Sequence, residues 1–160
     1  VVLEYTIRVK NNGEVVGFAK NIVDYLSNGL TFSSELNPDW YISGGNLYTK
    51  KLANEAINPG ESKEIEVIFT WINDENNLGV KTNIAAITAD YNEYGDAADI
   101  DSTPGDIDIT QYDHEQEDDD DYALVILTVK TGGGNSYIAI GLVVIAIIAT
   151  GIVLIKRYVL

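Results

Sequence analysis

Residues 64–71 read EIEVIFTW, a run in which apolar and polar side chains alternate almost without a break. Every second position from Ile65 to Trp71 is apolar, and successive side chains of a β-strand point to opposite faces. The turn sequence Asn58-Pro59-Gly60-Glu61 precedes this run, and its proline and glycine favour the backbone angles of a tight turn. We therefore predict a strand that follows a turn and buries one face.

Similar patterns occur on both sides of this strand, separated by Gly, Asn, Asp and Pro residues that favour turns. The further predicted strands are Leu3–Lys10, Phe18–Leu26, Leu30–Phe32, Trp40–Ile42, Leu47–Lys50, Val80–Tyr91 and Tyr122–Lys130. No helical period interrupts them. The predicted fold class is all-β, an immunoglobulin-like antiparallel β-sandwich of seven or eight strands in a domain over residues 1–131, with an acidic loop over 96–121.

A different segment follows at residues 137–155, which read YIAIGLVVIAIIATGIVLI and carry no charge. At ~1.5 Å per residue a helix of this length spans roughly 28 Å, close to the hydrocarbon thickness of a bilayer. A buried core helix is the alternative, but such a helix normally has a polar face. We predict one transmembrane α-helix after a Gly-rich hinge over 132–136. Lys156 and Arg157 then assign the tail, 156–160, to the cytoplasm and the β domain to the outside.

The composition describes an acidic exported domain. The chain has 25 Asp and Glu against 10 Lys and Arg, and no cysteine or methionine. A net charge of −15 argues against nucleic acid as a partner, and the absence of cysteine excludes disulfides. The chain starts inside a strand pattern without a leader, so we expect upstream domains of the same protein as partners, with the lipid bilayer contacted through 137–155.

Several short motifs resemble the conserved-repeat domain (domain of unknown function eleven) of bacterial, especially Gram-positive, surface proteins. The matching residues are Val9-Lys10-Asn11-Asn12-Gly13, Ala19, Asn21-Ile22, Asp24, Leu26, Gly29-Leu30, Phe32, Pro59-Gly60-Glu61, Asn83-Ile84-Ala85, Asp101-Ser102-Thr103-Pro104-Gly105, Glu117-Asp118-Asp119 and Ala123. The chain departs from the family at Leu26-Ser27, where Leu-Pro is frequent, and at Asp106, where Asn is frequent. The resemblance implies an immunoglobulin-like stalk or adhesive module without catalytic activity.

Two functions follow from this resemblance and the predicted anchor. We favour a membrane-proximal spacer that holds upstream domains away from the membrane of a bacterial cell. The alternative is an adhesin-type module that binds a host or neighbouring-cell ligand through exposed aromatic residues such as Trp40, Tyr41, Tyr91 and Tyr94. An enzyme is not expected, because cysteine is absent and His114 is the only histidine.

The acidic loop is the candidate metal site. Its carboxylates include Asp99, Asp101, Asp106, Asp118 and Asp119. Dense like charges repel, so an ordered loop would need a cation, and Ca²⁺ takes about 6–8 oxygen ligands of this kind. The open alternative is a disordered acidic tether. No cofactor other than calcium is expected.

The sequence contains residues of the types found in two covalent linkages. Lys10 and Asn83, with Asp24 or Glu66, are the residue types of an internal isopeptide bond, but Lys10 falls on the polar face of its strand and we predict no bond. Lys130-Thr131-Gly132 resembles the end of the Leu-Pro-x-Thr-Gly signal that sortases cut between Thr131 and Gly132 to attach proteins to peptidoglycan. The proline is missing here, so we favour a permanent anchor over sorting to the cell wall.

Overall fold

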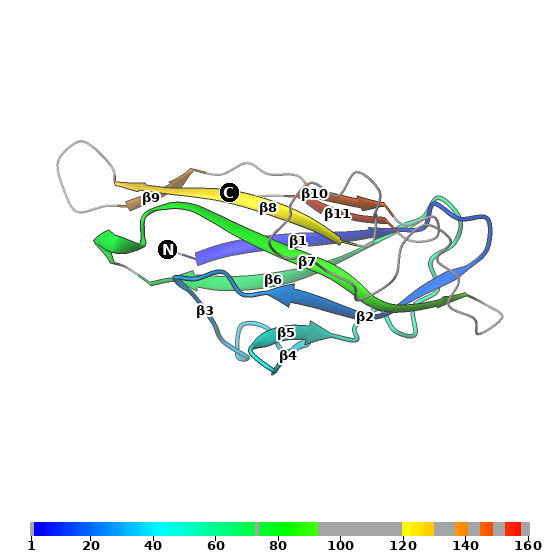
Figure 1. Cartoon of the computed structure of the whole chain (residues 1–160). Helices are drawn as coiled ribbons and strands as arrows, with labels where there is room; N and C mark the ends of the chain where they lie inside the picture. The colour runs from blue at the N-terminus through cyan, green and yellow to red at the C-terminus, as the bar shows by residue number, and fades with distance from the viewer. Residues whose placement is uncertain are drawn as a thin grey trace.

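The structure is a computed structural model that describes residues 2–72, 74–92, 120–129, 137–140, 145–148 and 153–157. The described residues form two antiparallel sheets, one ordered β10-β11-β1-β6-β3 and the other β4-β5-β2-β7-β8-β9 (Figure 1). The strands are β1 (Val2–Lys10), β2 (Gly17–Tyr25), β3 (Leu30–Phe32), β4 (Trp40–Ser43), β5 (Asn46–Thr49), β6 (Ser62–Trp71), β7 (Gly79–Asn92), β8 (Asp120–Val129), β9 (Tyr137–Ile140), β10 (Ile145–Ile148) and β11 (Val153–Arg157). A 3-10 turn, η1 (Glu75–Asn77), precedes β7.

The buried core lies between the two sheets. The described elements are strands and one 3-10 turn, which confirms the predicted all-β class. The predicted apolar face of β6, from Ile65 to Trp71, is at most 3% exposed at its four alternate positions. Tyr5 of β1 packs edge-to-face on Phe69, with ring centroids 5.6 Å apart. The second sheet contributes buried residues to the same cluster, among them Ile22. Burial of each such side chain stabilises the fold by about 1.5–3 kcal/mol, which is what makes a β-sandwich-like arrangement of these strands stable.

Two motifs that lie far apart in the sequence meet at the turn after β1. The backbone of Asn11 pairs with the 58–61 turn, donating to Glu61 O at 2.9 Å and accepting from Gly60 N at 2.7 Å. Its buried side chain donates to Val15 O and Ile57 O, each at 2.7 Å. Asn11 alone therefore provides hydrogen-bond partners for backbone groups of two loops.

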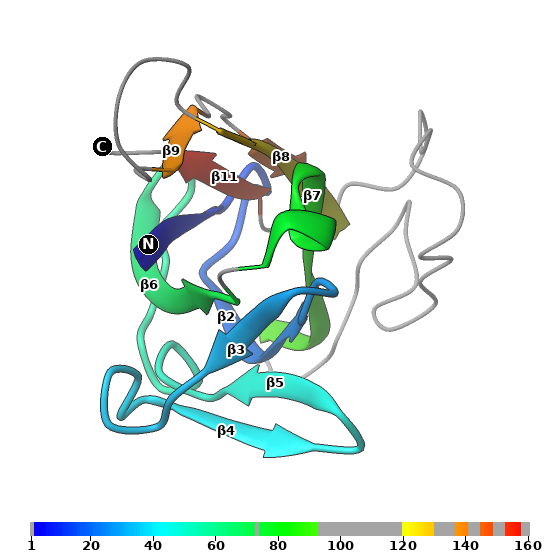
Figure 2. The same cartoon turned by 90° about the vertical axis from the view of Figure 1, so that its left-hand side faces the viewer.

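The strand directions place the start of β1 and the end of β8 at the same end of the two-sheet structure. Val2, which begins β1, pairs with Thr70 near the end of β6. Gly79, which begins β7, pairs with Leu127 near the end of β8. Because the short connection between β6 and β7 joins these two places, the start of β1 and the end of β8 lie at one end, on the left of Figure 1. The β4–β5 hairpin lies on the side of the molecule away from β8 and β9 (Figure 2).

The segment predicted as a transmembrane helix differs from that prediction wherever it is described. Residues 137–140, 145–148 and 153–157 are strands, and β9 pairs with β8 while β11 pairs with β1. Within the described residues, no helix has the length and apolar character needed to cross a bilayer. The physical reason for strands is composition, because the segment is rich in Ile and Val, whose branched side chains favour extended backbone as well as an apolar environment.

Candidate functional site

Most of the sites predicted from the sequence lie outside the described residues. These are the calcium candidates Asp99, Asp101, Asp106, Asp118 and Asp119 and the sorting residues Thr131 and Gly132. In the part of the chain that is described, no group of three or more His, Asp or Glu side chains is arranged to hold a metal ion.

Lys10 and Asn83, the two residue types of an isopeptide bond, lie apart in the structure. Asn83 is fully buried and donates from Nδ2 to Oδ2 of the equally buried Asp24 at 2.6 Å. Lys10 is the last residue of β1, beside the turn that leads into β2, whereas Tyr25 at the other end of β2 pairs with Ile84. Lys10 and Asn83 therefore lie toward opposite ends of the sandwich. The Asp24–Asn83 pair instead joins β2 to β7 inside the core.

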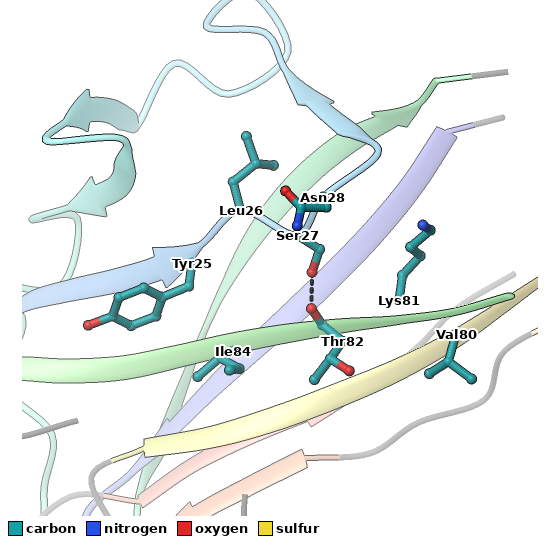
Figure 3. Close-up of a pocket in the computed structure, with 8 residues that line it drawn as sticks. All are labelled: Tyr25, Leu26, Ser27, Asn28, Val80, Lys81, Thr82 and Ile84. Carbon is teal, nitrogen blue, oxygen red and sulfur yellow. Dashed lines mark hydrogen bonds between the residues drawn. The ribbon is translucent and has the colours of Figure 1, made fainter. Parts of the chain in front are cut away.

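One surface hollow, of about 310 Å³, lies where β2 ends beside the start of β7 (Figure 3). Ser27 and Thr82 lie at its centre, with Tyr25 toward one end and Val80 toward the other. The Ser27 hydroxyl donates to the Thr82 carbonyl, so its proton is directed to the backbone and not to a base that could activate it. The hollow lies beside the antiparallel pairing of β2 with β7, where Tyr25 is opposite Ile84.

A second hollow, of about 320 Å³, lies on the outer face of the same sheet, beside β2, β4 and β5. We name it the Tyr41–Tyr48 hollow; it is lined by Lys20, Asn21, Tyr41, Ser43, Tyr48, Lys50 and Ala89. Tyr41 of β4 and Tyr48 of β5 are directly opposite in the strand register, and their rings stack with centroids 5.8 Å apart and planes 26° apart. Alternation places them outward, because Trp40 and Leu47, one residue before each, are in the core.

An irregularity in the strand pairing shapes the same hollow. Ala19 pairs with Asp90 and Asn21 with Ala89, so Lys20 has no partner residue in β7. Such bulges redirect side chains and bend the strand locally. The Asn21 side chain closes the irregularity by donating to Thr88 Oγ1 at 2.6 Å. The bulge therefore sets Lys20 and Asn21 beside the tyrosine pair.

The charge of the Tyr41–Tyr48 hollow is opposite to that of the chain. Its described lining contains two lysines, Lys20 and Lys50, and no Asp or Glu, although the chain has 25 acidic residues. Neither lysine forms an ion pair with another described residue, whereas the adjacent Lys51 pairs with Asp39 at 2.6 Å. The Lys20 amine also lies 6.0 Å from the centre of the Tyr91 ring, within cation–π range.

The structure corrects part of the aromatic surface expected from the sequence. Trp40 is in the core, only 4% exposed, and its Nε1 donates to Glu66 O at 2.7 Å. Tyr91 is half-buried, stacks on Phe18 with centroids 4.6 Å apart, and donates to Ala53 O. Tyr41 is exposed as expected, and Tyr94 lies outside the described residues.

The sequence interpretation did not identify Lys20, Ser43, Tyr48 or Lys50 as site residues. One local signal was available, because Tyr48 and Lys50 are two positions apart in a strand and therefore share a face. The approach of Lys20 to that face depends on pairing between β2 and β5, which has no local signature.

No protein-family model, curated protein or solved structure matches this chain.

Proposed function

We propose that this chain is a membrane-anchored binding module, of adhesin type, in a bacterial cell-surface protein. The observation that carries this proposal is the position of the Tyr41–Tyr48 hollow relative to the chain ends. Tyr48 is level with Ala86 through Val23, and Asn21 is level with Ala89, whereas Leu127 near the end of β8 is level with Gly79. Seven to ten residues along β7 correspond to roughly 23–33 Å. The hollow therefore stands well away from the end at which an anchor would leave.

Cell attachment tests the binding role. The chain would be displayed on a heterologous Gram-positive host, and attachment of neighbouring cells would be counted for the native chain and Tyr41→Ala. We expect Tyr41→Ala to reduce attachment, because Tyr41 is an exposed part of the hollow. Ile42→Ala is the matched control, since Ile42 is exposed on the same strand but does not line the hollow. Equal attachment by the native chain and Tyr41→Ala would contradict the proposal.

The anchor is supported by residues 137–155, an uncharged segment long enough to cross a bilayer, followed by Lys156 and Arg157. This role requires the segment to be a continuous helix, so 137–140 and 153–157 would leave the edges of β8 and β1. The strand-paired and membrane-crossing arrangements exclude each other. We propose that the membrane-crossing one is adopted at the cell surface, because the bilayer solvates the apolar side chains.

Single cysteines can test the anchor, since the chain has none of its own. We expect Ser136→Cys to react with a membrane-impermeant maleimide on intact cells and Tyr158→Cys to react only after lysis. The two positions flank the segment, so their difference reports whether the chain crosses the membrane. Labelling of both cysteines on intact cells would show that it does not cross.

Sorting to the cell wall is the alternative to a permanent anchor. It is favoured by Thr131-Gly132 before the apolar segment and opposed by the absence of proline two residues before Thr131. Fractionation of cells that express the native chain and Thr131→Ala distinguishes the two. A permanent anchor predicts that both remain in the membrane fraction, whereas release of only the native chain by cell-wall hydrolases requires cleavage at Thr131.

A spacer in a stalk is the second candidate function, and the resemblance to tandem surface repeats favours it. A linear spacer needs its upstream and downstream connections at opposite ends. The start of β1 and the end of β8 lie at the same end, which is why we prefer the binding role. Electron microscopy of the longer protein tests this, because a stalk predicts that the upstream domain is held one domain length farther from the membrane.

Calcium binding by the acidic loop is the remaining proposal. Asp99, Asp101, Asp106, Asp118 and Asp119 supply carboxylates of the kind that Ca²⁺ prefers. A ligand that binds the folded state raises its thermal stability. We expect the unfolding midpoint to rise with calcium and to fall with excess chelator. An unchanged midpoint would favour the acidic tether.

A further inference from the structure

We propose that the Tyr41–Tyr48 hollow binds a carboxylated sugar, as in the hexuronate units of an acidic polysaccharide. This inference specifies the ligand of the binding role proposed above and does not depend on membrane anchoring. It rests on the combination of an exposed aromatic pair, two lysines without an ion-pair partner among the described residues, and an uncharged polar group on one outer sheet face.

The aromatic pair matches the apolar face of a sugar ring. Tyr41 is 45% exposed and stacks on Tyr48 of the neighbouring strand, which supports the exposed Tyr41 ring at the hollow. A pyranose ring carries C–H groups on its faces and hydroxyls at its rim. Tyrosine suits such a ligand, because it offers an apolar ring and a hydroxyl with few rotatable bonds.

The lysines supply the preference for a carboxylate. Lys20 and Lys50 both line the hollow and have no ion-pair partner among the described residues. Elsewhere in the described part of the chain Arg8, Lys51 and Lys63 are paired with Glu64, Asp39 and Glu61. A ligand carboxylate would provide the two hollow lysines with charge-assisted hydrogen bonds that no described residue supplies.

A polar group completes the match to a hydroxylated ligand. Ser43 lines the hollow beside the tyrosines, and its hydroxyl can donate to or accept from a sugar hydroxyl. The volume of about 320 Å³ lies at the lower end of the range of roughly 300–1,000 Å³ that holds small ligands. A nucleic acid fits less well, because two lysines on a chain with net charge −15 cannot neutralise a run of phosphates.

The experiment uses the full 160-residue chain in detergent micelles and measures binding by isothermal titration calorimetry. The probe is tetragalacturonate, and its matched control is the fully methyl-esterified tetramer, which keeps the rings but loses the charges. Hexaglutamate provides an acidic peptide for comparison. We expect tetragalacturonate to bind at least about 5-fold more tightly than its ester and for this difference to shrink at high salt.

Two neighbouring lysines give the matched variants. Lys50→Gln removes a charge from the hollow, and Lys51→Gln removes the same charge from the adjacent residue, which pairs with Asp39 outside it. We expect Lys50→Gln to weaken tetragalacturonate binding about 5-fold and Lys51→Gln by less than about 2-fold. Tyr41→Ala should also weaken binding, and Tyr41→Phe should retain most of it. Thermal unfolding of each variant checks that its fold is intact.

The outcomes separate this inference from the proposed function. Equal losses in the two lysine variants, equal binding of the ester, or tighter binding of hexaglutamate would each overturn recognition of a carboxylated sugar. Lack of tetragalacturonate binding would also overturn it, and the binding role would then stand only if Tyr41→Ala still lowers cell attachment. Unchanged attachment would refute the binding role itself, whatever the calorimetry shows.

Discussion

The side chain of Asn37 pairs with the backbone of Ile68 as a neighbouring strand would. Asn37 Nδ2 donates to Ile68 O at 2.8 Å, and Ile68 N donates to Asn37 Oδ1 at 2.7 Å. The same Nδ2 donates to Ser33 O at 2.8 Å, and the residue is 2% exposed. Asn37 thus fastens the loop between β3 and β4 to β6, which belongs to the opposite sheet from β4.

Loss of this side chain should weaken the whole fold. We expect Asn37→Ala to lower the free energy of unfolding by about 3 kcal/mol, because buried backbone groups of Ile68 lose their partners. Urea denaturation followed by tryptophan fluorescence measures the change. Asn12→Ala is the control, since Asn12 is exposed in a turn, and it should change stability by less than about 0.5 kcal/mol. Similar losses in both variants would contradict the special role of Asn37.

Replacing Gly29 by a residue with a side chain should destabilise the fold for two reasons. Gly29 has φ +84°, and a Cβ added there would overlap the Asn77 side chain, which donates from Nδ2 to Gly29 O at 2.7 Å. Gly45 has a similar φ of +88° but nothing within 4 Å of an added Cβ. We expect Gly45→Ala to cost about 1 kcal/mol from backbone strain alone and Gly29→Ala about 3 kcal/mol. Equal costs in thermal unfolding would mean that the Asn77 contact adds nothing.

The buried Asp24–Asn83 pair predicts a pH-dependent variant. Asn83→Asp would set a second carboxyl beside Asp24, and two carboxylates that close repel strongly in the core. We expect Asn83→Asp to be destabilised at pH 8 and to recover part of the loss at pH 5, where the folded protein binds a shared proton. Asn83→Ala adds no second carboxyl group, so its recovery between pH 8 and pH 5 should be smaller than that of Asn83→Asp. A pH-independent deficit in Asn83→Asp would contradict the pairing.

The 58–61 turn predicts an acid-sensitive contribution from Glu61. Hydrogen bonds from the Asn58 backbone and then its side chain lower the pKa of Glu61 below its usual value of 4.5, with a smaller contribution from Lys63. A lowered folded-state pKa stabilises the protein above pH 4.5, and this contribution disappears as the pH falls through the folded value. Glu61→Gln should therefore have a weaker pH dependence of stability below pH 4.5 than the native chain, as measured by urea denaturation. Parallel pH profiles for the two proteins would contradict this.

The local features of the strands were determined by the sequence. The alternation from Ile65 to Trp71 predicted both β6 and its buried face, and the 58–61 turn was recognisable from its proline and glycine. These predictions succeed because the direction of a side chain in a strand depends only on its position along that strand.

The tertiary structure decided the relationships between strands. Pairing of β2 with β5 brings Lys20 toward Tyr48, and the packing of β4 puts Trp40 in the core while Tyr41 faces out. Residues 137–140, 145–148 and 153–157 illustrate the same limit, because an apolar run rich in Ile and Val is compatible with a membrane helix and with strands. Whether such a run meets lipid or neighbouring strands depends on contacts with residues distant in the sequence. The hydrophobic periodicity of the run does not contain this information.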